Sequence, residues 1–212
     1  MPAADDPFME KDKQKQRRKP KQARAVEKYN AILDASARVL DAVGYRGATM
    51  SEIHLESGHP YATIYQYFGS KEDVYLAWLE RFMEVSIFEL ATLIRNAPKG
   101  DLNRYIEISV RYSLEQIVSN QKTLGRLING MSLISSKLVE IMEERSVQWI
   151  EQALGPEMSK YDNPRLLENM VTTARAGNGY WLMLVLNSKR EINIEQETKN
   201  YAALIRALLF IR

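Results

Sequence analysis

The stretch that decides the fold runs from Gly44 to Lys71 and reads GYRGATMSEIHLESGHPYATIYQYFGSK. Thr49 begins a Thr-x-x-Glu pattern, the spacing of a capping box that opens a helix. Gly58 can take the left-handed conformation that ends a helix. Ile64 and Phe68 stand four residues apart, so a second helix is expected to bury both on one face. The stretch therefore predicts a helix-turn-helix, two short helices joined by a tight turn, whose second helix carries aromatic and hydroxyl side chains suited to lying against DNA.

The same residues follow a recurring pattern without a gap. The pattern runs Gly-Tyr or Gly-Phe, Thr-Thr or Thr-Val, Ile-Ala, Ala-Gly-Val-Ser, Thr-Leu-Tyr, Phe and Ser-Lys-Glu, and this stretch resembles the TetR family of transcriptional regulators in which it occurs. Two departures, His54 for a small residue and His59 for an apolar one, bear on how the second helix docks. The matching residues are Gly44-Tyr45, Thr49-Met50, Ile53-His54, Ser57-Gly58-His59-Pro60, Thr63-Ile64-Tyr65, Phe68 and Ser70-Lys71-Glu72.

The resemblance implies how the second helix meets DNA. A helix in the major groove needs donors and acceptors on its exposed face. Thr49, at a helix N-terminus, is expected to bind a phosphate through its hydroxyl and the free backbone N–H groups. Lys71 puts a positive charge in the first turn of a helix, where the helix dipole disfavours it. A phosphate partner would explain this position. The resemblance implies that Tyr61, Ala62 and Thr63 reach the base edges, and that the DNA backbone is held by Tyr65, Gln66, Tyr67 and Lys71. The alternative for Tyr65 and Tyr67 is packing in the core of the protein. The alternative for Gln66 is reading a base.

A basic arm precedes the helix-turn-helix. Residues 11–24 contain eight basic residues and one acidic residue, whereas the whole chain has a net charge of only +2. Arms of this kind contact the DNA backbone or minor groove beside helix-turn-helix domains, with counterion release as the driving force. We expect Arg17, Arg18 and Lys21 to contact DNA, with a solvated tail as the alternative and as the preferred interpretation of residues 1–10.

The remaining sequence predicts an all-α protein of about nine helices. Apolar residues recur at spacings of three and four, and no alternation at period two is found. The expected domains are an arm over residues 1–22, a DNA-binding domain over 23–72, and an effector-binding and dimerisation domain over 73–212, with a long fourth helix joining the last two. The first helix is expected over about residues 23–43, and the next two are those of the helix-turn-helix. The fourth is expected from Ser70 to about Asn96, the fifth from Asp101, a short sixth around 125–130 and the seventh over about 133–154. The last two are expected from Asn163-Pro164 to about residue 186 and from Asn193 onward.

By resemblance, the C-terminal two thirds holds a small-molecule pocket and a dimer interface made by the last two helices. Pockets mix large apolar bodies with a few polar tips, although such residues also form ordinary cores. Small residues inside a helix, where glycine costs about 1 kcal/mol relative to alanine, indicate close approach of another helix. The candidates for the pocket are Tyr105, Ser109, Tyr112, Leu127, Met131, Trp149, Met170 and Asn178, and those for the interface are Ala174, Gly177, Trp181, Leu184, Leu204 and Leu208.

Composition excludes several classes of protein. The chain has no cysteine and two histidines, both in the helix-turn-helix, so no cofactor or metal site is expected. No nucleophile–base spacing or phosphate loop indicates an enzyme, and the absence of a signal peptide or an apolar run of about 20 residues predicts a cytoplasmic protein. We expect a homodimeric, ligand-responsive repressor that binds a palindromic DNA operator and is released by a small hydrophobic or amphipathic effector. The alternative is a helical interaction protein that binds DNA without sequence preference.

Overall fold

The structure, a computed structural model, describes residues 19–130, 136–149, 151–152, 165–186 and 191–209. Over these ranges it contains nine α-helices and no strand, which confirms the expected all-α class. The predicted helix boundaries at Gly155-Pro156 and Asn163-Pro164 lie outside the described residues. The helices are α1 (Ala23–Gly47), α2 (Met50–Ser57), α3 (Tyr61–Tyr67), α4 (Lys71–Asn96), α5 (Leu102–Ser119), α6 (Gln121–Gly130), α7 (Ser136–Trp149), α9 (Leu166–Leu186) and α10 (Ile194–Leu209).

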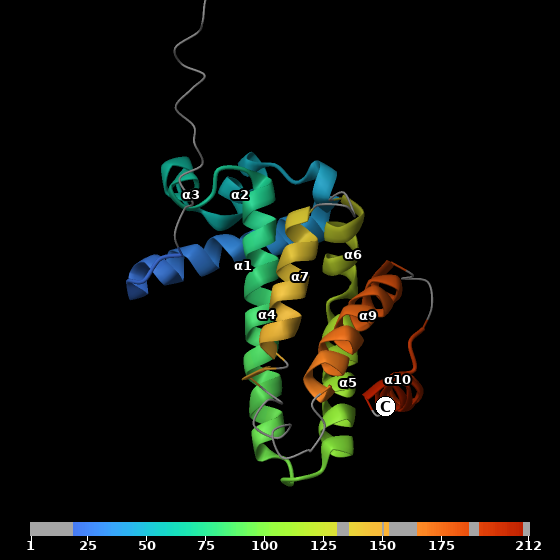
Figure 1. The fold of residues 1–212 in the computed structure, drawn as a ribbon. Coiled ribbons are helices and arrows are strands. Elements are labelled where there is room, and N and C mark those ends of the chain that lie inside the picture. The colour runs from blue at the N-terminus through green and yellow to red at the C-terminus, as the bar shows by residue number, and fades with distance from the viewer. Residues whose placement is uncertain (1–18, 131–135, 150, 153–164, 187–190, 210–212) are drawn as a thin grey trace, which may run out of the picture.

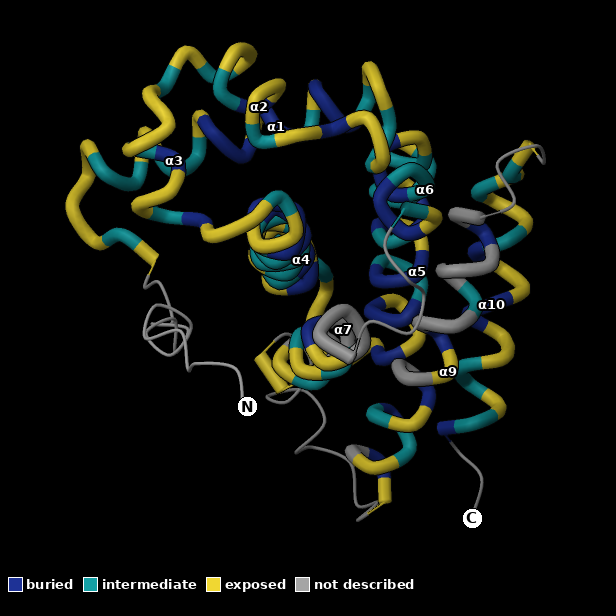
Figure 2. Tube along the Cα trace, turned by 90° about the horizontal axis from the view of Figure 1, so that it is seen from above, coloured by how far each residue is buried: buried dark blue, intermediate teal, exposed yellow. Residues whose placement is uncertain are grey.

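Helices α1, α2 and α3 gather at one end of the molecule, and the long α4 runs away from them (Figure 1). α5 returns beside α4, and α6 continues in the same direction until it contacts α1. Seen from above, α7 lies against α4, while α9 and α10 lie on the α5 side (Figure 2). The end of the molecule that holds the helix-turn-helix is therefore contacted by α4, which runs to the other end, and by α6, which α5 connects to the other end.

The helix boundaries follow the capping residues that the sequence predicts. The Thr49 hydroxyl accepts a hydrogen bond from the Glu52 backbone N–H at 3.1 Å, and Gly58 ends α2 with φ 66°. Ser70 and Asp73 form a complete capping box at the start of α4. Gly44 has φ 72° and interrupts α1 where the sequence predicts its end. Asp101 and Asn193 likewise cap α5 and α10 through their side-chain oxygens.

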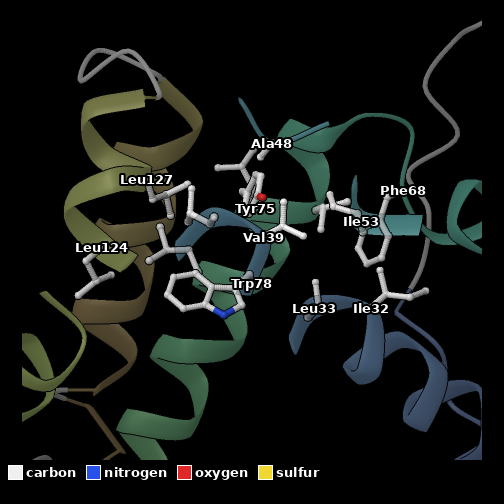
Figure 3. Close-up of a cluster of buried hydrophobic side chains, with 14 of the residues drawn as sticks. Ile32, Leu33, Val39, Ala48, Ile53, Phe68, Tyr75, Trp78, Leu124 and Leu127 are labelled. Carbon is white, nitrogen blue, oxygen red and sulfur yellow. The ribbon is translucent and has the colours of Figure 1, made fainter. Parts of the chain in front are cut away.

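One hydrophobic core, here called the N-terminal core, holds the helix-turn-helix together and extends beyond it. Leu124 and Leu127 of α6 point toward Trp78 and Tyr75 of α4, beside Val39 of α1 (Figure 3). Burying a side chain of this size contributes roughly 1.5–3 kcal/mol, so α6 is held firmly to the DNA-binding end. The core consists of Ile32, Leu33, Val39, Leu40, Ala48, Ile53, Ile64, Phe68, Val74, Tyr75, Leu76, Trp78, Leu79, Leu124, Leu127, Ile128 and Ile141.

A second hydrophobic cluster, the C-terminal core, joins the far half of α4 to α5, α9 and α10. The division of the chain near residue 72 into two domains stays a proposal, and the N-terminal core is continuous across that position. No helix in the described ranges is both long enough and apolar enough to cross a membrane. The C-terminal core consists of Leu90, Ile94, Leu102, Tyr105, Ile106, Val110, Tyr112, Leu114, Leu166, Met170, Leu184, Tyr201, Ala202 and Leu209.

Candidate nucleic-acid interface

The second helix of the helix-turn-helix, α3, has one buried face and one exposed face. Ile64 is 0% exposed and Phe68, just after the helix, is 2% exposed, as their spacing predicts. Tyr61 and Tyr65 are 41% and 43% exposed, which is unusual for side chains of this size. The exposed face thus presents two phenol groups that can donate and accept hydrogen bonds. Ala62 and Gln66 are also exposed, and Thr63 is half-buried.

His54 of α2 connects the two helices of the motif. Its Nδ1 lies 2.7 Å from the backbone oxygen of His59, and because a carbonyl only accepts, Nδ1 carries the proton and donates. Its ring stacks on Tyr61 with centroids 4.2 Å apart, and Tyr61 in turn stacks on Tyr65 at 6.3 Å. The residue that departs from the family pattern therefore fixes the turn and supports the exposed tyrosines.

Lys71 has internal partners at the junction of α1, α2 and α4. Its ammonium group donates to the backbone oxygens of Tyr45 at 2.8 Å and Ala48 at 3.0 Å, and it lies 4.6 Å from the centre of the Tyr45 ring. Two carbonyls and a ring thus stabilise a charge that the sequence explained by a phosphate partner. A DNA contact by Lys71 stays a prediction.

Tyr67 lies at the border between the exposed face and the core. Its half-buried ring makes an edge contact with Tyr29 of α1 at 5.7 Å, and Tyr29 also packs on Phe68 at 5.0 Å. Burial raises the pKa of Tyr29 to about 12, with the nearby carboxylates of Glu80 and Glu84 adding to the effect. Tyr67 thus shares the packing that the sequence left as its alternative role.

The described part of the basic arm contacts α4. Lys19 pairs with Glu84 at 2.8 Å and with Glu80 at 3.3 Å. Lys21 is exposed, whereas Arg17 and Arg18 lie outside the described residues. Thr49 is exposed at the start of α2, and its hydroxyl serves as the helix cap.

The geometry is that of a helix-turn-helix, and the sequence match agrees with it. Residues 32–78 match the model of the bacterial regulatory proteins of the tetR family. Over these residues the chain is similar to the TetR family. Members of this family are DNA-binding transcriptional regulators, and the match supports a DNA-binding role for this end of the molecule.

Solved structures share the fold over most of the chain. The fatty acid degradation regulator FadR from Bacillus halodurans is 21% identical, with 88% of this chain and 96% of that chain covered and a TM-score of 0.67. A TetR-family regulator from Streptomyces coelicolor is 18% identical, with 87% and 97% covered and a TM-score of 0.64. At these identities the likeness shows the fold alone. Among curated proteins, none matches the sequence.

α6 is tied to the C-terminal part of α1 by polar contacts that the sequence did not predict. The Arg126 guanidinium donates to the backbone oxygens of Leu40, at 3.1 Å, and of Asp41. The Thr123 hydroxyl donates to the Asp41 carboxylate at 2.7 Å. These partners are more than 80 residues apart in the chain, so no local pattern reveals them.

The described side chains among the residues predicted to line an effector pocket divide between the two cores, and the pocket stays a prediction. Tyr105, Ser109, Tyr112 and Met170 are buried in or against the C-terminal core, whereas Leu127 belongs to the N-terminal core. The Tyr112 hydroxyl donates to Glu89 at 2.6 Å, and burial together with this bond raises its pKa. Met131 and the side chains of Trp149 and Asn178 lie outside the described part of the structure.

A groove between α4 and α7 was not predicted from the sequence. It has a volume of about 310 Å³, and no residue of the predicted pocket lines it. Its wall combines apolar side chains of α4 with charged and polar side chains of α4, of α7 and of the residues just after α7. The lining residues are Glu84, Ile87, Phe88, Ala91, Arg95, Arg145, Gln148 and Gln152.

The predicted interface residues divide between buried and exposed positions. Gly177 and Leu184 are buried within the chain, and the Leu184 backbone oxygen accepts a hydrogen bond from Gln121 at 3.1 Å. Leu204 of α10 is 51% exposed, and Leu208 is half-buried. The side chains of Ala174 and Trp181 lie outside the described part. The dimer interface stays a prediction, for which Leu204 offers an exposed apolar contact.

Proposed function

We propose that this protein is a ligand-responsive repressor that binds a palindromic operator as a homodimer and is released by a small hydrophobic or amphipathic effector. The single observation that carries the proposal is the ordered, exposed face of α3, where Tyr61 and Tyr65 are held by the stack that begins at His54. A face held in place before DNA arrives loses little conformational entropy on binding. Tyr61, Ala62 and Thr63 would reach base edges, and Thr49, Tyr65 and Gln66 would hold phosphates.

Release by an effector requires a mechanical connection between the two ends of the molecule. α4 and α6 both contribute side chains to the N-terminal core; α4 also contributes to the C-terminal core, and α6 follows α5, which does so too. A displacement of either helix would therefore change the position of α3. Allosteric coupling of this kind is typically 1–3 kcal/mol and is reciprocal, so DNA must weaken effector binding by the same factor.

The dimer proposal follows from the need to read two half-sites. A twofold dimer places two recognition helices about one turn of DNA apart, so its operator is palindromic. The exposed apolar side chain of Leu204 supports α10 as part of the interface. The association state can be measured by analytical ultracentrifugation, with Leu204→Glu expected to shift the dimer toward monomer.

Selection of bound DNA from a random duplex pool at near-physiological salt tests the proposal. Recovery of a palindromic motif with half-sites about 10 base pairs apart is the expected result. Binding without any enriched motif, disappearing as salt rises, would instead support the interaction protein that binds DNA without sequence preference.

A further inference from the structure

We propose that the groove between α4 and α7 binds a small amphipathic anion, with its charged head held by Arg145 or by Arg95, which lie toward opposite ends of the groove, and its apolar body covered by Phe88 between them. This proposal adds a binding site to the ligand-responsive function proposed above. The effect of the ligand on DNA binding rests on that function. The groove volume of about 310 Å³ is at the lower end of ordinary ligand sites, so a small molecule is the fitting occupant.

The charge of the groove favours an anion. Two guanidinium groups line it, against the single carboxylate of Glu84. Arg95 contacts the Thr92 hydroxyl at 2.9 Å and pairs with no carboxylate among the described residues. Guanidinium groups bind carboxylate and phosphate with paired hydrogen bonds. A ligand head of either kind would therefore give Arg95 the negatively charged partner that it lacks among the described residues.

Glu84 is shared between two cations. Its Oε1 atom accepts from Lys19 and from Arg145, each at 2.8 Å. Arg145 also donates to the Gln148 side chain at 2.8 Å, and its side chain is only 21% exposed. Lys19 also pairs with Glu80 at 3.3 Å, so Arg145 shares its one carboxylate oxygen with a cation that has a second partner, and Arg145 can turn part of its hydrogen bonding to a ligand anion.

The apolar side of the groove favours an apolar body on that anion. Ile87, Phe88 and Ala91 lie along α4 beside the two arginines. Phe88 is 69% exposed, among the most exposed large apolar side chains of the described chain. Covering such a ring stabilises a complex through the hydrophobic effect, whereas a purely ionic ligand would leave it in water.

The shared carboxylate connects the groove to the DNA-binding arm. Lys19 precedes α1 in the basic arm, Glu84 lies on α4 and Arg145 lies on α7. An anion that takes Arg145 leaves Glu84 to hold Lys19 alone, and Lys19 is then less available to a DNA phosphate. Ligand binding in this groove should therefore weaken DNA binding.

Calorimetric titration of the full-length protein with decanoate, decyl phosphate and decanol, each below its micelle concentration, tests the site. Both anions should bind at least tenfold more tightly than decanol, and the tighter of the two identifies a carboxylate or a phosphate head. Either Arg95→Gln or Arg145→Gln should weaken anion binding tenfold or more and so identify the end of the groove that holds the head, and Glu84→Gln should strengthen binding because the competing carboxylate is gone. Arg104→Gln is the matched control, since this exposed arginine of α5 lies outside the groove.

Equal binding of decanol and decanoate, or unchanged binding in both arginine variants, would overturn the site. A fluorescent duplex tests the coupling: the better anion should lower the duplex affinity of the wild type severalfold and that of Glu84→Gln less. An equal decrease in both proteins would overturn the link through Glu84. If no duplex binds at all, the repressor function fails, while the calorimetry still decides whether the groove is an anion site.

Discussion

The imidazole of His54 and the phenol ring of Tyr61 are stacked 4.2 Å apart across the turn of the helix-turn-helix, with 26° between their planes. His54 belongs to α2 and Tyr61 opens α3, so the stack joins the two helices in addition to the turn itself. The hydrogen bond from His54 to the His59 backbone oxygen fixes the ring in that position. The orientation of the recognition helix thus depends on a side chain that lies outside it.

Replacing His54 with alanine should therefore weaken both folding and DNA binding. An aromatic pair contributes about 0.5–1.5 kcal/mol beyond its buried area, and a hydrogen bond about as much, so the free energy of unfolding should fall by about 1–3 kcal/mol. DNA affinity should fall roughly tenfold, because Tyr61 loses its support. Urea unfolding and fluorescence anisotropy with a selected duplex measure the two effects. His59→Ala is the matched control, because His59 contributes backbone groups to this turn; an equal loss in that variant would contradict the role of the stack.

Tyr65→Ala should abolish specific DNA binding without unfolding the protein. The side chain is 43% exposed and touches Tyr61 on the surface, so its loss should change the free energy of unfolding by no more than about 0.5 kcal/mol. Tyr65→Phe keeps the ring and removes the hydroxyl, so intermediate affinity in that variant would assign the hydroxyl to a phosphate. Full operator affinity in Tyr65→Ala would show that α3 reads DNA through other residues.

Lys71→Met should destabilise the fold, because two backbone oxygens lose their donor. Leaving buried acceptors unsatisfied costs about 1–3 kcal/mol each, and the partly exposed site places the expected loss near the lower end of that range. Lys21→Met, which removes an exposed charge from the arm, should leave the free energy of unfolding unchanged. Equal stability of the two variants in urea would return Lys71 to a role on DNA alone.

The sequence predicted those parts of the structure that depend on neighbouring residues. The cap at Thr49, the left-handed Gly58 and the capping box at Ser70 are local hydrogen-bond patterns, and each is confirmed. The burial of Ile64 followed from helical spacing in the same way.

Contacts between distant segments could not be predicted in this manner. The two carbonyls that bind Lys71 lie 23 and 26 residues away, and Arg126 reaches α1 across 86 residues. Tyr105 and Leu127 both look like pocket residues by type, but they pack into different cores because α5 and α6 meet different helices. The groove between α4 and α7 depends in the same way on which faces these helices turn to each other.

Gly130→Ala should destabilise the protein, which is the reverse of the usual effect in a helix. Alanine normally stabilises a helix by about 1 kcal/mol relative to glycine. Here an added Cβ atom would lie 2.1 Å from the Tyr45 Cβ, so α6 or the end of α1 after Gly44 must move. Overpacking of this kind costs about 1–3 kcal/mol and should also lower DNA affinity. Asn129→Ala, at an exposed position on the same turn, should change stability by no more than about 0.5 kcal/mol, and a stabilised Gly130→Ala would refute the close contact.

The ionisation of Tyr29 should make the protein less stable as pH rises from 10 to 12. Burial, aided by Glu80 and Glu84, raises the pKa of this phenol from 10.0 to about 12. Below pH 10 the phenol is protonated in both the folded and the unfolded state, so it adds no pH dependence. Between these values the unfolded state releases the proton more readily, and the equilibrium shifts toward unfolding. The loss should be smaller than the ~1.4 kcal/mol per pH unit of a fully shielded group, because the ring is partly exposed.

Tyr29→Phe removes the titrating hydroxyl and keeps the ring that packs on Tyr67 and Phe68. Urea unfolding of both proteins at pH 9, 10, 11 and 12 should therefore give a shallower decline for the variant. Burial raises the pKa of Tyr201 to about 12 as well, so the variant should still lose some stability over the same range. If the two stability curves ran parallel from pH 9 to 12, the phenol of Tyr29 would ionise equally in the folded and unfolded chains, and its burial beside Tyr67 and Phe68 would be refuted.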